Sequence, residues 1–68
     1  MLTLLEENLI ETMKTLKIEW ETIVGLMLML KENKVGQSML MKFLKETNPK
    51  ELTQRIIVKK ASQIAIEN

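Results

Sequence analysis

The side chains that could do chemistry in this chain are glutamates, lysines and one arginine, Arg55. The sequence has nine Glu and nine Lys, but it has no His, Cys, Asp or Tyr. The missing types supply most of the general bases, nucleophiles and metal ligands of enzymes. Glu and Lys are sufficient for ion pairs, so we expect a non-enzymatic protein that uses no metal and no cofactor.

Charge is distributed unevenly along the chain, although the net charge is only +1. Residues 1–21 carry five Glu and two Lys, whereas residues 22–68 carry seven Lys and Arg55 against four Glu. Basic groups of this kind contact phosphates in nucleic-acid complexes. One functional hypothesis is therefore a small DNA-binding regulator that uses the Lys42–Lys60 segment. Its candidate contacts are Lys50, Arg55, Lys59 and Lys60.

Other features weaken the DNA-binding hypothesis. The chain has a single arginine, and only Gln54 and Gln63 could read base edges from the last predicted helix. No aromatic residue is expected on the surface to stack on bases. We therefore interpret most of these lysines as the solvated faces of helices.

Apolar residues recur every three or four positions through the first half of the chain, which is the spacing of one helix face. No Gly, Pro or Asn interrupts residues 9–24, and Thr3 and Glu6 have the spacing of a capping box. The pattern predicts one long helix over about residues 3–33, with Trp20 in the core. The stripe comprises Leu2, Leu5, Leu9, Met13, Leu16, Trp20, Ile23, Met27 and Leu30.

The alternative to this long helix is a break near Lys17-Ile18-Glu19 that gives two shorter helices. Helices beyond about 25 residues are uncommon in globular domains. At the far end, Asn33 or Gly36 could take the left-handed conformation that terminates the helix.

Two shorter helices are predicted to follow, over about residues 39–46 and 49–66. Ser38 is placed to cap the first of them, and Asn48 with Pro49 marks the start of the second. No strand pattern competes with these helices. The sequence therefore predicts an all-α fold, a single small helical domain over residues 1–68.

Eight consecutive residues, Ile23–Leu30, have no polar side chain. At about 100° per residue they visit every face of a helix, so this segment needs apolar neighbours on all sides. Gly25, Leu28 and Met29 lie opposite the main stripe, on the side where the first half of the helix is polar. A helical Gly costs about 1 kcal/mol relative to Ala, but it lets another backbone approach closely.

Gly25, Leu28 and Met29 are thus the candidate self-association interface. A chain of about 60 residues buries only about 60% of its unfolded surface, and this one has no disulfide to compensate. We expect a homodimer whose second copy completes the helical bundle, acting as a protein–protein interaction module in a pathway that the sequence does not identify. Two alternatives remain: the later helices cover this face within one chain, or another protein's helix occupies it.

The sequence argues against the membrane as a partner. The first residues, Met1–Glu7, have no basic region, and Ile23–Leu30 is far shorter than the roughly 20 residues that span a bilayer. We expect a cytoplasmic protein with no membrane role, consistent with the lack of cysteine. The Lys-, Ile-, Glu-, Asn- and Met-rich composition resembles that of small helical bacterial proteins, a resemblance that implies no activity.

Overall fold

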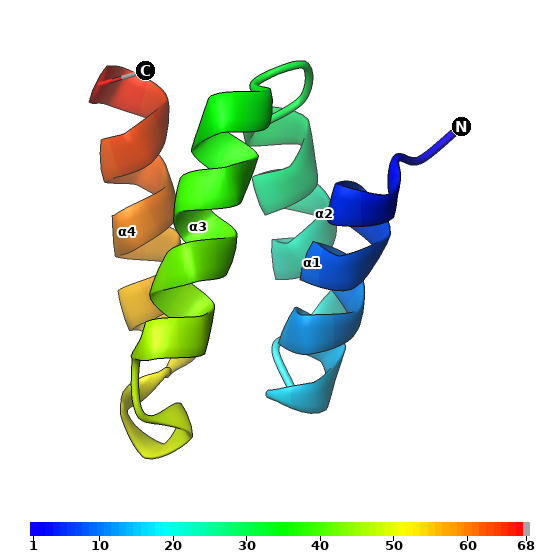
Figure 1. Cartoon of the computed structure of the whole chain (residues 1–68). Helices are drawn as coiled ribbons and strands as arrows, with labels where there is room; N and C mark the ends of the chain where they lie inside the picture. Colours follow the sequence, from blue (N-terminus) through cyan, green and yellow to red (C-terminus); the bar gives the residue numbers. More distant parts are fainter. Residues whose placement is uncertain (68) are drawn as a thin grey trace.

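The structure, a computed structural model, describes residues 1–67. These residues form helices and no strand, which confirms the predicted all-α class. Each α-helix runs antiparallel to the one before it, so α1 starts and α4 ends at the same end of the bundle (Figure 1). The elements are α1 (Leu4–Thr15), α2 (Trp20–Met29), α3 (Lys34–Glu46), the 3₁₀ turn η1 (Pro49–Glu51) and α4 (Gln54–Glu67).

The α-helices surround one core in the order α1, α2, α4, α3. Helices α1 and α4 each pack against both α2 and α3, and they lie diagonally opposite each other. Each fully buried aliphatic side chain contributes about 1.5–3 kcal/mol, so this core is the main source of stability. Its buried members are Leu9, Met13, Ile18, Ile23, Leu26, Leu30, Leu40, Leu44, Leu52, Ile57, Ala61 and Ile64.

A chain reversal separates α1 from α2. The predicted continuous helix is therefore wrong, and the alternative break near residues 17–19 is confirmed. Helix α1 ends in a Schellman motif, in which the Ile18 N–H donates to the Met13 carbonyl at 3.0 Å. In the same motif the Lys17 N–H donates to the Lys14 carbonyl at 2.9 Å. Lys17 adopts the required left-handed backbone, with φ of 63°, and Met13 and Ile18 both lie in the core.

Helix α3 begins earlier than predicted, at Lys34, because Asn33 caps it. The Asn33 Oδ1 accepts a hydrogen bond from the Gly36 N–H at 2.8 Å. Neither of these residues is the left-handed end of the preceding helix, since Glu32 adopts that conformation with φ of 63°. Ser38 lies inside α3 and not at its start.

The predicted helix over residues 49–66 is divided into two elements. Asn48 marks a helical start, as expected, because its Oδ1 accepts from the Lys50 N–H at 2.9 Å. The element that starts there is the short turn η1, and α4 begins only after Thr53. The Thr53 Oγ1 accepts from the Ile56 N–H at 3.3 Å and so caps the final helix.

One polar side chain lies within the core. Gln37 on α3 is 2% exposed, and its Nε2 donates to the Leu30 carbonyl at the end of α2 over 2.8 Å. Its Oε1 has no hydrogen-bond partner among the described atoms. This bond connects two helices that lie diagonally across the bundle, and it fixes the end of α2 against α3.

Replacing Lys17 with Gly tests the left-handed turn. We expect Lys17→Gly to raise the free energy of unfolding by about 0.5–1 kcal/mol, because Gly adopts positive φ without the steric penalty of a Cβ. Urea denaturation followed by circular dichroism measures this change. The control Lys14→Gly, inside α1, should lower the same free energy by about 1 kcal/mol. A loss of stability in both variants would contradict the turn.

The two glycines should respond oppositely to alanine. A Cβ on Gly36 would lie 2.7 Å from the Asn33 Nδ2, whereas a Cβ on Gly25 would have no described atom within 4 Å apart from its chain neighbours and its own helix backbone. We expect Gly36→Ala to displace the cap and lower the unfolding free energy by about 1 kcal/mol. Gly25→Ala should raise it by about 0.5–1 kcal/mol, measured at concentrations where the chain is monomeric. Equal effects of the two changes would contradict the geometry at the α3 start.

Candidate functional site

The exposed side of α2 is almost wholly apolar. The exposed residues of this helix are Trp20, Glu21, Val24, Gly25, Leu28 and Met29, and of these Glu21 is charged. The Trp20, Val24 and Leu28 side chains are 58%, 39% and 66% exposed. Their spacing of four residues aligns them in one row along the helix, which we call the α2 row.

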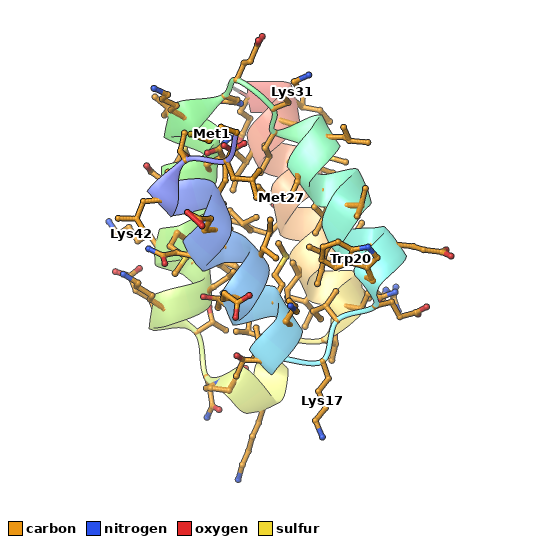
Figure 2. All side chains as sticks on the ribbon, turned by 90° about the vertical axis from the view of Figure 1, so that its right-hand side faces the viewer. Met1, Lys17, Trp20, Met27, Lys31 and Lys42 are labelled. Atoms are coloured by element: carbon orange, nitrogen blue, oxygen red, sulfur yellow. The ribbon has the colours of Figure 1, made fainter. Side chains whose placement is uncertain are left out.

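A groove lies between the α2 row and α1. Figure 2 shows Met27 between the two helices, with Trp20 beside the lower part of α2 and Met1 near the upper end of α1. The groove has a volume of about 470 Å³, and its charged lining residues are Glu6 and Lys31. We call it the α1–α2 groove. It is lined by Met1, Leu2, Glu6, Ile10, Trp20, Ile23, Val24, Met27, Leu28 and Lys31.

The predicted interface residues Gly25, Leu28 and Met29 all lie on the exposed side of α2. Leu28 and Met29 are 66% and 44% exposed, and apart from its chain neighbours and its own helix backbone no described atom lies within 4 Å of the Cβ position of Gly25. The alternative in which the later helices cover this face is therefore wrong for these residues. Leu28 also lines the α1–α2 groove, whereas Gly25 and Met29 lie outside its lining.

Trp20, predicted to be a core anchor, is 58% exposed. The reversal before α2 resets the phase of the apolar stripe, so the predicted continuation through Trp20 fails. Ile23 and Leu30 face the core from α2 as the stripe predicts, and Leu26 joins them from outside the stripe. Trp20 lines the edge of the groove. Leu2, the first residue of the predicted stripe, is also exposed and lines the same groove.

The remaining groove residues were missed because the groove is a product of tertiary structure. Met1, Ile10 and Val24 belong to no common sequence pattern, and they meet only when α1 packs beside α2. The sequence predicts one continuous helix over about residues 3–33, and a continuous helix cannot form a groove with itself.

A reciprocal pair of hydrogen bonds positions the start of α2. The Glu19 N–H donates to the Gln54 Oε1 at 3.1 Å, and the Gln54 Nε2 donates to the Glu19 Oε1 at 3.3 Å. The pair satisfies one of the amide groups left free at a helix start. Gln54, which we considered as a base-reading residue, thus has a structural role. No local pattern could indicate it, because its partner is 35 residues away.

The candidate nucleic-acid contacts are divided among different surroundings. Arg55 and Lys59 are both exposed, one turn apart on the same side of α4. Lys60 instead places its Nζ 5.3 Å from the centroid of the Phe43 ring on α3, in a cation–π contact. Lys50 is exposed on η1. Of the four candidate nucleic-acid contacts, the structure therefore places Arg55 and Lys59 together on one helix face.

Residues 1–67 contain neither a cluster of metal-ligating side chains nor a membrane-spanning helix. Within this range, no three His, Cys, Asp or Glu side chains gather in a way that could hold a metal ion. None of the described helices combines the length and the hydrophobicity needed to cross a membrane. Among the described residues, an ion pair joins the Lys14 Nζ to the Glu11 Oε2 at 3.6 Å on the surface of α1.

A pair of alanine substitutions tests where Trp20 lies. In the monomer we expect Trp20→Ala to lower the unfolding free energy by at most about 1 kcal/mol, because most of its ring is in water. Leu9→Ala, at a fully buried site, should lower it by about 2–5 kcal/mol. Chemical denaturation at low protein concentration measures both changes. A larger loss for Trp20→Ala than for Leu9→Ala would return Trp20 to the core.

Comparisons of the chain with known protein families, with curated proteins and with solved structures find no match. The function is therefore inferred from the chemistry of the α2 row, the α1–α2 groove and the charges around them.

Proposed function

We propose that this protein is a non-enzymatic helical interaction module that forms a homodimer through the α2 row and the α1–α2 groove. The observation that carries the proposal is the row itself, in which Trp20, Val24 and Leu28 stand exposed in one line. Contiguous apolar patches of this kind mark interaction sites on soluble domains. Burial of the parts of these side chains that are still exposed would contribute about 25 cal/mol per Å² of apolar surface.

A second copy is the occupant that we favour. Most soluble oligomers are homo-oligomers, and their commonest form is a two-fold symmetric dimer. A standard interface buries about 800 Å² per partner, which is about one sixth of the 4893 Å² surface of this chain. The exposed side of α2 together with the groove extends over two of the bundle's helices, α1 and α2.

DNA binding receives less support than self-association. Of the basic candidates, Lys60 is engaged with Phe43, and the nearby Gln54 is engaged with Glu19. Of the other three candidates, Lys50 is on η1, and the pair of Arg55 and Lys59 on α4 is too small a footprint for strong phosphate binding.

Placing a charge in the α2 row should disrupt the dimer. We expect the wild-type chain to have about twice the 7.9 kDa monomer mass by light scattering, and Leu28→Lys to have the monomer mass. The reason is that an unpaired lysine would be desolvated at the interface. The matched control is Val35→Lys on α3, where the wild-type side chain is 63% exposed, and it should remain dimeric.

Trp20 offers a second readout of the same experiment. Its emission should shift to shorter wavelength as the wild-type protein is concentrated, since association removes water from the ring. A monomer at every concentration, or a dimer that Leu28→Lys leaves intact, would contradict the proposal. Salt-sensitive binding to duplex DNA that Lys59→Glu abolishes would instead favour the DNA-binding hypothesis.

A further inference from the structure

Opposite charges lie at the two ends of the exposed side of α2. Glu21 stands near the start of the helix and Lys31 just beyond its end, and both are exposed. At a rise of about 1.5 Å per residue they are about 15 Å apart along the helix. The α2 row lies between them, and Lys31 lines the α1–α2 groove together with Val24 and Leu28.

Neither charge belongs to an ion pair within residues 1–67. Among the described residues, the recorded ion pair is on α1, between Glu11 and Lys14. Glu21 lies on the same side of the helix as Val24 and Leu28, because at about 100° per residue the three fall within about 60° of arc. A partner that covers the α2 row must therefore come close to Glu21 at one end and to Lys31 at the other.

We infer that two copies pair with their α2 helices antiparallel, with Glu21 of each protomer beside Lys31 of the partner subunit. The inference rests on the proposed self-association and specifies its orientation. In an antiparallel two-fold pair both ends then bring opposite charges together. In a parallel pair each charge would meet its own copy, so that carboxylate faces carboxylate and ammonium faces ammonium. Complementary charge of this kind determines orientation and register more than it adds affinity.

The same register places Gly25 next to the crossing point. The position midway between Glu21 and Lys31 is Leu26, which is buried in the core, and the adjacent Gly25 is exposed. Near a two-fold axis the two helices are closest together, so the absence of a side chain at Gly25 lets the two backbones approach closely. Val24 then lies beside Leu28 of the partner subunit, which pairs the large side chains of the two rows.

Charge reversal tests the orientation, with light scattering over a hundredfold range of concentration as the measurement. We expect Glu21→Lys and Lys31→Glu each to raise the dimer dissociation constant by about tenfold or more, because each change creates two repulsive contacts per dimer. The double variant, Glu21→Lys with Lys31→Glu, restores both attractive contacts. Its dissociation constant should return to within about threefold of the wild-type value.

Matched controls carry the same charge changes elsewhere. Glu46→Lys on α3 and Lys59→Glu on α4 are both at exposed positions, and both should leave the dissociation constant unchanged. Added salt should reduce the defects of the two single variants at α2, since the repulsion is screened. Circular dichroism of each variant verifies that these surface changes leave the helices folded.

The outcomes separate the orientation from the proposed function. A wild-type dimer that both single variants leave unchanged indicates parallel or other pairing, and it overturns the orientation while the dimer remains. Weakened single variants without recovery in the double variant also overturn the pairing of Glu21 with Lys31. A wild-type chain that is monomeric throughout the range overturns the dimer and the orientation together.

Discussion

The architecture depends on one backbone constraint, the left-handed turn at Lys17. A straight helix over the first thirty residues would be about 45 Å long and would leave its apolar stripe extended in water. The Schellman motif reverses the chain instead, so that α1 and α2 pack side by side and share a core with α3 and α4. The α1–α2 groove is a direct product of this reversal, because its two walls are the two halves of the predicted single helix.

The helical class, the capping box that Thr3 and Glu6 form at the start of α1, and the helical start at Asn48 were predictable, because each depends on local chemistry. The break near residues 17–19 was predicted only as the alternative to a continuous helix, because position 17 carries Lys where a left-handed residue is usually Gly or Asn. A strain of about 1 kcal/mol at that residue is small beside the burial of Met13, Ile18 and Ile23, which lie in the common core. The misplacement of Trp20 follows from the same error, since the stripe changes phase at the turn.

The candidate interface was predictable in part. Eight apolar residues in succession exceed what the neighbours of one helix cover, and Leu28 and Met29 are indeed left exposed. The groove, the exposed Trp20 and the Gln54–Glu19 pair were not predictable, because they join segments distant in sequence. An apolar face alone would attract many surfaces. The opposite charges at the two ends of the exposed side of α2, with Gly25 between them, favour one orientation of a partner over the other. They therefore help to distinguish a specific partner from other apolar surfaces.

The short connections between successive helices have a kinetic consequence. Each helix packs against its neighbour in sequence or the next but one, so most native contacts join nearby parts of the chain. Helical domains with such low contact order typically fold within microseconds to milliseconds. While the chain is unfolded, the segment Ile23–Leu30 is its most aggregation-prone part, since it carries no charge at all. Rapid folding of the bundle buries about half of that segment soon after synthesis. Newly synthesised chains therefore have little time to aggregate.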